Sequence, residues 1–515
     1  MSVRDTLLPF LAGLSFMLAA CTDALEEAQQ EAATARALYA AGNLPAARSA
    51  IGRAMSHRDD QLDIILLDAR IKYAMGDVRP AYDAYRTVLV FDSDNMEALP
   101  IVAQLAIGLN ELRVARDAIK KALEIDPRRG DVIMSQAILH LNLREFDEAI
   151  VTADRLLETS PNDPRGIAIK ARALSQQGKR AQAFDLLDDT IGEIGNQELL
   201  SITLLEIARS EGRVPTMLEQ FAFLVPRNPE STELALDEIN TLYKSGTVDR
   251  ARLRSASFID RFGQDPDAMH QLVELWEEYD ENPTLDSAAN RLARSDMAPA
   301  RMAVARFYLR RGKVDRAEDF VKHAPDSRYM GLIARLHVAR GSDEGPRLAR
   351  QILQSDTTNC DALSALVRSE LAARDNRKAI VNAQLLATQC NDRLDGYLGL
   401  VEAYAKDDRT ASVERVYREG IEVHPQNPEL SEAFANWLVS RGRNRAAVSA
   451  MRRLGNAAPS RISTWEAYAR VCETIDDSVC RKDAAAGLAK AKDVYVLDPL
   501  PGSRPRDPIF GRSWS

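Results

Sequence analysis

The sequence predicts an all-α protein in which about fourteen helix–turn–helix pairs stack into a right-handed solenoid. Three observations support this prediction. Alanine recurs every 34 residues along the first part of the chain. Glycine or another turn residue recurs between the alanines with the same spacing. The 515 residues are 45% hydrophobic but only 6% aromatic, which suits closely packed helices better than β-sandwiches.

Two tracks of alanine define the repeat. One track consists of Ala47, Ala81, Ala115, Ala149 and Ala183, and the other lies 12 residues earlier, at Ala35, Ala69, Ala103, Ala137 and Ala171. We expect the two helices of a pair to cross at these positions, because larger side chains would hold the backbones apart. Each helix pair therefore places its small residues at its own crossing point.

The turn inside each pair falls at a third set of positions with the same spacing. Glycine occupies this position at Gly42, Gly76, Gly178, Gly212 and Gly246, while Asn110 and Arg144 fill the two remaining repeats. Glycine suits the end of a helix because it adopts left-handed backbone geometry without strain. The first helix of each pair is therefore expected to end here.

These features resemble the tetratricopeptide repeat, a helix–turn–helix unit with small residues at its eighth and twentieth positions and proline near its thirty-second. The segment Met96–Arg129 matches best, with Ala103, Ala115 and Pro127 in place. The resemblance implies a non-catalytic scaffold that binds proteins or peptides on the concave face of a solenoid. Partner-binding residues are expected at the ninth and twelfth positions, which are occupied by Arg70, Tyr73, Arg172 and Arg209.

The regularity of the repeat divides the chain into segments. Regular repeats are expected over residues 28–265 and degenerate ones over 266–359, because Gly312 lies 66 rather than 68 residues after Gly246. The period resumes over 360–497, which ends in a cap. Four prolines in residues 498–515 predict a disordered tail.

The N-terminal segment predicts export. The apolar run from Leu7 to Ala20 is 14 residues long and too short to span a membrane, so residues 1–20 are expected to be a signal peptide. Leu18-Ala19-Ala20-Cys21 resembles the lipobox of bacterial lipoproteins, which implies a lipid on Cys21 and a tether over residues 21–27. An unlipidated secreted protein is the alternative. The expected location is the periplasmic side of the cell envelope, with the outer membrane favoured because Thr22 follows the cysteine.

Four further cysteines are expected to form two disulfides. Cys360 opens the first helix of one pair and Cys390 closes the second, while Cys472 and Cys480 flank the turn of the last pair. An oxidising compartment favours the bonds Cys360–Cys390 and Cys472–Cys480, and four buried thiols are the alternative. Redox catalysis is not expected because the sequence has no Cys-x-x-Cys motif.

Several function classes are disfavoured. The chain has 67 basic and 76 acidic residues and a net charge of −9, so we do not expect it to bind nucleic acid. Motifs for phosphate loops, dinucleotide binding, zinc proteases and serine hydrolases are absent from the sequence. No cofactor and no metal ion are expected, since the six histidines are scattered.

The sequence thus favours a scaffold, anchored in the envelope, that holds envelope proteins or peptides during assembly of an export, pilus or polysaccharide machine. A polysaccharide-binding or polymer-guiding subunit is one alternative. An unrecognised enzyme in the irregular stretch 266–356 is another, and its candidate residues are His270, Trp276, Tyr279, His323 and His337. The enzyme hypothesis requires these side chains to share one pocket.

Overall fold

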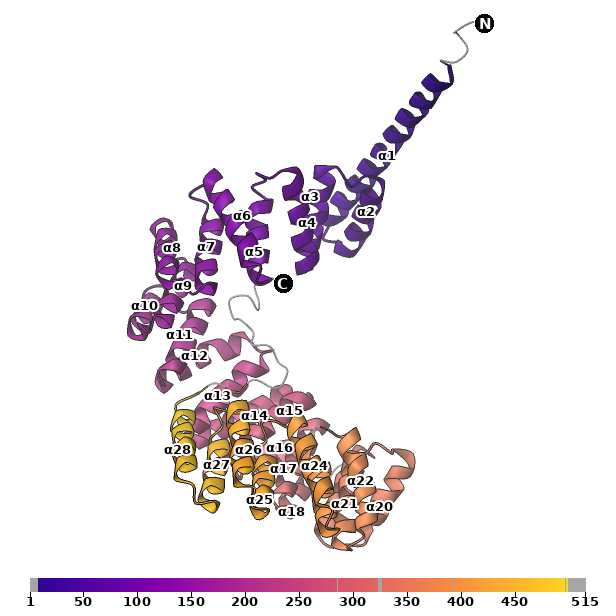
Figure 1. Ribbon diagram of the computed structural model, residues 1–515, viewed down its shortest axis with the longest axis vertical. Helices are drawn as coiled ribbons and strands as arrows, with labels where there is room; N and C mark the ends of the chain where they lie inside the picture. Colours follow the sequence, from indigo (N-terminus) through magenta and orange to yellow (C-terminus); the bar gives the residue numbers. More distant parts are fainter. Residues whose placement is uncertain (1–7, 285, 323–326, 392, 496, 499–515) are drawn as a thin grey trace. The chain divides into compact units, whose positions relative to one another are not determined.

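A computed structural model describes residues 8–284, 286–322, 327–391, 393–495 and 497–498 (Figure 1). These residues form 28 α-helices and one short 3₁₀-helix, and the described part of the chain contains no strand. The predicted all-α fold is confirmed. Helices alternate as first and second members of fourteen pairs, from α1 and α2 to α27 and α28.

The chain divides into two compact units, one ending at Ile207 and one beginning at Ala208. The helices of the first unit are α1 (Leu8–Ala40), α2 (Leu44–His57), α3 (Leu62–Ala74), α4 (Val78–Phe91), α5 (Ala98–Gly108), α6 (Leu112–Ile125), α7 (Gly130–Asn142), α8 (Phe146–Thr159), α9 (Pro164–Gln176) and α10 (Arg180–Ile194). The boundary falls inside α11 (Glu198–Ser210).

The second unit contains the remaining helices. They are α12 (Val214–Arg227), α13 (Thr232–Lys244), α14 (Val248–Phe262), α15 (Pro266–Tyr279), α16 (Asp286–Ala293), α17 (Ala298–Arg310), α18 (Val314–Asp319), α19 (Met330–Ala339), α20 (Glu344–Ser355), α21 (Cys360–Ala372), α22 (Asn376–Gln389), α23 (Leu394–Lys406), α24 (Thr410–Val423), α25 (Pro428–Ser440), α26 (Asn444–Ala457), α27 (Ile462–Thr474) and α28 (Ser478–Lys492). The 3₁₀-helix, η1 (Ser327–Tyr329), precedes α19.

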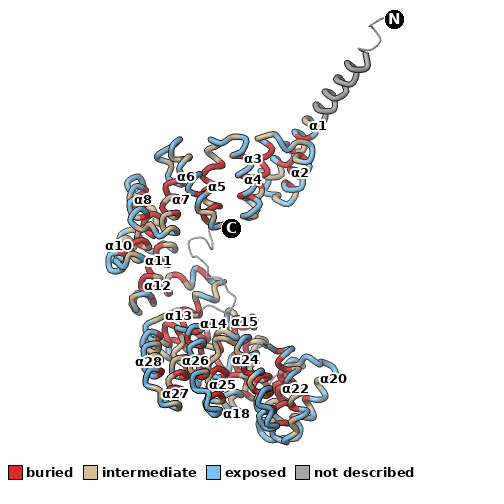
Figure 2. The backbone as a smooth tube through the Cα atoms, viewed as in Figure 1, coloured by how far each residue is buried: buried red, intermediate tan, exposed pale blue. Residues whose placement is uncertain are grey.

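Helix pairs pack as the alanine tracks predict. All ten alanines of the two tracks have no exposed surface, so the predicted crossing points are confirmed. Within each unit, the first helices of successive pairs also contact one another, as α5 contacts α7 and α19 contacts α21. We call the surface made by these odd-numbered helices the first-helix face. Buried residues recur along the helices of both units (Figure 2).

The turns inside the pairs adopt left-handed geometry whether or not they contain glycine. The backbone angle φ is +74° at Gly76, +59° at Asn110 and +61° at Arg144. Arg374 and Asp408 occupy the same place in later pairs with φ of +60° and +55°. The position in the repeat therefore dictates the conformation, and the non-glycine residues adopt it with local strain.

The irregular stretch of the sequence has a structural cause. Its second helices are short, since α16 has 8 residues and α18 has 6, whereas α4 and α6 have 14 each. Arg301, which is 6% exposed, compensates for the early end of α18, because its Nε donates to the Phe320 carbonyl at 2.9 Å. The ring of Phe320 stacks on Tyr308 with centroids 6.1 Å apart. The stacked aromatic rings thus supply packing contacts beyond the end of the short helix α18.

The second unit closes on itself. Arg461, ahead of α27, pairs with Glu274 of α15 at 2.9 Å, and the Ser463 backbone N–H donates to Glu278 at 2.8 Å. Figure 1 shows α13 to α15 in the same region as α26 to α28. Residues about 185 positions apart in sequence therefore share one contact zone.

The backbone of α1 is helical through the predicted tether at residues 21–27. Among the described residues, no helix has both the length and the apolar composition needed to cross a membrane. The predicted tail from residue 499 onward lies outside the described residues, whereas Leu497 and Asp498 are described and packed in the second unit.

Candidate functional site

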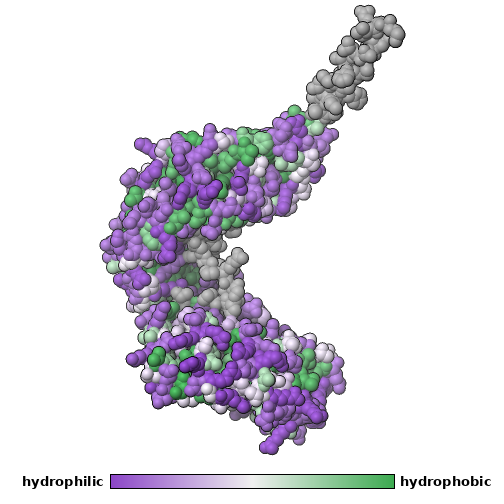
Figure 3. All heavy atoms as spheres, in the orientation of Figure 1, coloured by the Kyte–Doolittle hydropathy of each residue, from purple (hydrophilic) through white to green (hydrophobic). Residues whose placement is uncertain are grey.

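The first-helix face of the first unit carries a hollow of about 370 Å³ between α3, α5 and α7. Its lining residues are Tyr73, Met96, Glu97, Pro100, Ile101, Gln104, Arg129, Asp131 and Ser135. Apolar surface from Pro100 and Ile101 lies beside the amide of Gln104 and the phenol of Tyr73. This mixture is typical of sites that bind a side chain and orient it with a few hydrogen bonds. Apolar and hydrophilic residues also intermingle on the face of this unit drawn in Figure 3.

Arg129 fixes one edge of the hollow. Its Nη1 donates to the Met96 carbonyl at 2.8 Å, and its Nε donates to Asp131 at 2.9 Å. These bonds join the loop before α5 to the loop before α7. The edge of the hollow is therefore held in place before any ligand arrives.

The predicted binding residue Tyr73 lies in this hollow. Its ring packs edge-on against Tyr85 with centroids 6.1 Å apart, and burial raises the pKa of its phenol. The hydroxyl group is therefore protonated at neutral pH.

The three predicted arginines each form an ion pair with the next repeat. Arg70 binds Glu97 through two hydrogen bonds of 2.6 and 2.5 Å, and Glu97 lines the hollow. Arg172 binds Glu206 at 3.0 and 3.1 Å. Arg209, in the second unit, binds Asp237 at 2.6 Å. These arginines join neighbouring first helices, and Arg70 reaches the hollow through its partner.

Gln104 and Asn240 also lie on the first-helix face, although neither was predicted to be a site residue. Both belong to the series that begins at Arg70 and passes through Arg172 in steps of 34 residues. Gln104 lines the hollow, and Asn240 binds backbone in the second unit. Their spacing from Arg70 would have revealed them, because equivalent positions in successive repeats lie on the same face.

The second unit contains a larger cavity of about 880 Å³. Residues of α15, α17, α19 and α23 line it together with the loops before α25 and α27. Six arginines reach its wall, namely Arg306, Arg310, Arg328, Arg335, Arg393 and Arg461. Acidic neighbours offset most of this charge, as Glu277 pairs with Arg310 and Glu274 pairs with Arg461.

Asp361 is the centre of a buried charge network beside this cavity. The carboxylate is 4% exposed and binds Arg306 at 2.7 Å, Arg393 at 2.9 Å and Arg335 at 3.0 Å. Burial alone would raise the pKa of Asp361, but the three guanidinium charges hold it well below its usual range. Arg335 also pairs with Asp395 at 3.2 Å. The network joins α17, α19, α21 and α23 through charge, in addition to the apolar packing between α19, α21 and α23.

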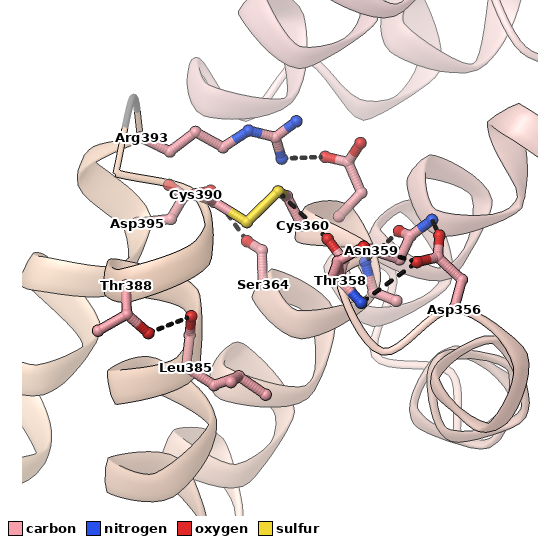
Figure 4. The surroundings of a disulfide bond; sticks show 12 residues. Asp356, Thr358, Asn359, Cys360, Ser364, Leu385, Thr388, Cys390, Arg393 and Asp395 are labelled. Carbon is pink, nitrogen blue, oxygen red and sulfur yellow. Dashed lines mark hydrogen bonds and ion pairs between the residues drawn. A yellow bond between two sulfur atoms is a disulfide. The ribbon is translucent and has the colours of Figure 1, made fainter.

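The structure contains the same two disulfides that the sequence predicts. Cys360 and Cys390 are bonded with Cα atoms 6.0 Å apart, and Cys472 and Cys480 are bonded with Cα atoms 5.4 Å apart. Figure 4 shows the first bond beside Ser364, whose hydroxyl donates to Asp395 at 2.9 Å. This disulfide therefore fixes the start of α21 and the end of α22 next to the Asp361 network.

The described candidates for an enzymatic centre do not share a pocket. Trp276 is fully buried and its indole donates to Ser255 at 3.3 Å. His270 faces the 880 Å³ cavity, while His337 lies 3.7 Å from Glu344. Tyr279 stacks on Tyr243 with centroids 5.6 Å apart. His323, the remaining candidate, lies outside the described residues.

Among the residues that the structure describes, no three His, Cys, Asp or Glu side chains gather in a way that could hold a metal ion. The charged clusters of both units pair acids with arginines instead. Their chemistry is that of ion pairing and hydrogen bonding.

No protein-family model matches the chain, and no curated protein matches its sequence. Solved structures of partial similarity include a tetratricopeptide repeat protein from Parabacteroides merdae, with 15% identity and a TM-score of 0.41. That similarity covers 48% of this chain and 98% of the other.

Two other solved structures are similar over shorter stretches. YrrB, described as a TPR protein with an unusual peptide-binding site, is 16% identical with a TM-score of 0.32 over 35% of this chain and 95% of its own. PilW, described as a type IV pilus biogenesis factor, is 20% identical with a TM-score of 0.35 over 40% of this chain and 96% of its own. The repeat geometry described above identifies the fold as a tetratricopeptide-like array.

Proposed function

We propose that this protein is a scaffold anchored in the bacterial envelope and that the 370 Å³ hollow of the first unit binds a segment of a partner protein. The carrying observation is the pre-formed hollow on the first-helix face, where the polar side chain of Gln104 lies with Tyr73 and the apolar side chain of Ile101. Arg129 and the Arg70–Glu97 pair keep its walls in position. A protein segment carries both polar and apolar groups.

The anchor would be a lipid on Cys21. The lipobox-like residues before Cys21 support this proposal, and two disulfides in the second unit are consistent with an oxidising compartment. The protein would then face the periplasm, with the outer membrane as the favoured site. Mass spectrometry of the mature N-terminus tests the anchor, since an unmodified or uncleaved Cys21 would contradict it. Cys21→Ser should release the protein from membranes.

An anchored scaffold of this kind suits the assembly of an export, pilus or polysaccharide machine. The proposed role needs a fixed position and a binding surface, and it needs no chemistry at the site. Partners identified by capture in living cells decide among the three machines.

The test of the binding site uses a photo-crosslinking residue in place of Gln104, inside the hollow. A matched control carries the same crosslinker in place of Lys120 on α6, whose side chain is 77% exposed. We expect a protein to be captured from position 104 and not from position 120. Tyr73→Ala should remove the capture at 104.

Equal capture at both positions, or capture that Tyr73→Ala leaves unchanged, would show that the hollow is not the binding site. Circular dichroism should be identical for the variants, because Tyr73 lies at the edge of the packed interior. A loss of capture with retained helicity then reports on binding alone.

A further inference from the structure

The chain that follows α28 lies against α13 through contacts to its backbone. We call the described residues 493–495 and 497–498 the strap. Asn240 Nδ2 donates to the Tyr495 carbonyl at 3.2 Å, and the Lys244 ammonium donates to the Val494 carbonyl. The Leu497 backbone N–H donates to the Asp237 carboxylate. Backbone groups of the strap thus make its hydrogen bonds to α13.

The three groups that hold the strap come from one face of one helix. Asp237, Asn240 and Lys244 are spaced three and four residues apart, which places them in a row along α13. Asp237 is 5% exposed and Asn240 is 1% exposed. Buried polar side chains are costly unless they are hydrogen-bonded, so a row of them facing non-helical backbone has the character of a peptide-binding surface.

Neighbouring residues hold these groups in place. Arg209 Nη2 binds Asp237 at 2.6 Å and its guanidinium lies over the Phe221 ring, 5.5 Å from the centroid. The arginine predicted to contact a partner therefore orients the carboxylate that binds the strap. Asn240 occupies the same position in its repeat as Gln104, which lines the hollow of the first unit.

The side chains of the strap add a second layer of recognition. Leu497 packs against the apolar core around α13 to α19. The Tyr495 ring lies beside Gly212, in the turn between α11 and α12. The Asp498 carboxylate accepts hydrogen bonds of 3.1 and 3.2 Å from the Ser460 backbone N–H. The sequence that fits this surface has an aromatic residue, a leucine two positions later and then a carboxylate.

We infer that the α13 face is a peptide-binding site that the strap fills in cis, and that a partner's extended segment with this aromatic–x–leucine–acid pattern replaces the strap. The α13 face uses other residues than the hollow of the first unit, so this inference does not depend on the proposed function. A resident strap makes binding conditional, because a partner competes with a segment that is tethered nearby at high effective concentration.

The test uses full-length protein and a fluorescent synthetic peptide with the sequence of residues 493–498. In the unaltered chain the strap occupies the site, and the peptide should bind weakly. In the full-length double variant Tyr495→Gly and Leu497→Gly the strap is weakened, and the peptide should bind at least tenfold more tightly by fluorescence anisotropy.

Asn240→Ala, added to the double variant, should weaken peptide binding about tenfold, because one buried hydrogen bond is lost. The control is Lys120→Ala, which changes a side chain of α6 that is 77% exposed and should leave the affinity unchanged. A peptide with the same residues in scrambled order should not bind. Equal binding to the unaltered chain and the double variant, or no effect of Asn240→Ala, would overturn the inference.

A second measurement leaves the strap sequence intact. Asn240→Ala in the otherwise unaltered chain should speed hydrogen exchange at the Leu497 amide at least tenfold, while amides of α21 to α24 keep their protection. Unchanged exchange at Leu497 would show that the α13 face does not hold the strap and would overturn the inference.

Discussion

The ammonium group of Lys244 donates to the carbonyl oxygen of Ser460 at 2.8 Å, although 216 residues separate them. The same group binds the Ala491 carbonyl at 3.1 Å, at the end of α28. One lysine therefore joins α13 to the last two helix pairs of the second unit. Most contacts in a repeat array connect neighbouring repeats, whereas Lys244 connects repeats that are far apart in the sequence.

Replacing Lys244 with methionine should destabilise the second unit by about 2 kcal/mol at pH 7, because buried carbonyls lose a charged donor. Urea unfolding followed by tryptophan fluorescence measures this loss, since Trp276, Trp437 and Trp465 all lie in this unit. Lys406→Met is the control, because Lys406 lies on the surface with 40% of its side chain exposed.

The Lys244 contribution should also depend on pH. Burial lowers the pKa of Lys244 from 10.5 to about 8, although Glu278 and Asp498 oppose the shift. Between these two values the unfolded chain binds a proton that the folded chain has lost, so the free energy of unfolding rises with pH. The stability difference between the unaltered chain and Lys244→Met should widen by about 1 kcal/mol from pH 7 to pH 9. A constant difference would mean that the group does not titrate in this window.

Asp361→Asn should destabilise the second unit by about 3 to 5 kcal/mol, since three guanidinium groups would lose their shared carboxylate. The matched control is Glu414→Gln, which weakens the exposed pairs with Arg418 and Arg443 and should cost less than about 1 kcal/mol. The urea midpoint reports both effects. A loss no larger than that of the control would contradict a central role for Asp361.

The Asp361 network also predicts a response to acid. Folding lowers the pKa of Asp361, so its contribution is fully present above the unfolded value of 3.8. The contribution should decline as the pH falls below about 4, because the unfolded chain takes up a proton there that the folded chain does not yet bind. Asp361→Asn should therefore lose less stability than the unaltered chain does over that range. Parallel acid titrations of the two proteins, followed by circular dichroism, provide the comparison.

Removing the two disulfides should have unequal effects. The Cys360–Cys390 bond closes 30 residues and should contribute about 3.5 kcal/mol, whereas Cys472–Cys480 closes 8 and should contribute about 2.5 kcal/mol. Urea unfolding of variants in which both cysteines of a pair are replaced by alanine gives each value. A reducing agent should lower the free energy of unfolding only of proteins that retain a disulfide. Insensitivity of the unaltered chain to reductant would show that the cysteines are not bonded.

Arg144→Gly should stabilise the first unit by about 1 kcal/mol, because Arg144 holds left-handed geometry with φ of +61°. Arg128→Gly is the control, since Arg128 lies in the exposed loop before α7, outside the left-handed turns, and glycine there only increases the freedom of the unfolded chain. Thermal unfolding of the two variants measures the change in stability that each substitution causes. Equal effects at both positions would show that the turn geometry carries no strain.

The parts of this structure that repeat could be predicted from the sequence, and the parts that close it could not. The crossing alanines and the left-handed turn at Asn110 follow from a 34-residue period. The disulfides follow from the places of their cysteines within a pair. All of these features involve residues within one repeat or the next, where spacing in sequence determines spacing in the fold.

The Asp361 network and the strap have no such pattern. Arg306 lies 55 residues before Asp361, in the stretch where α16 and α18 are short and the period slips. Asn240 and Tyr495 are 255 residues apart. A periodic sequence indicates which face a residue occupies, but it does not indicate which distant segment covers that face.

The closure of the second unit has a consequence for how the chain folds. Each early helix pair finds its contacts in adjacent pairs, so the first unit can become ordered progressively as the polypeptide emerges. The hydrogen bonds of Lys244 to Ser460 and Val494 can form only after residues 460–494 have been synthesised. The second unit should therefore complete its folding in a single late, slow step. Until then Asp237, Asn240 and Lys244 on α13 remain accessible to chaperones and to other chains.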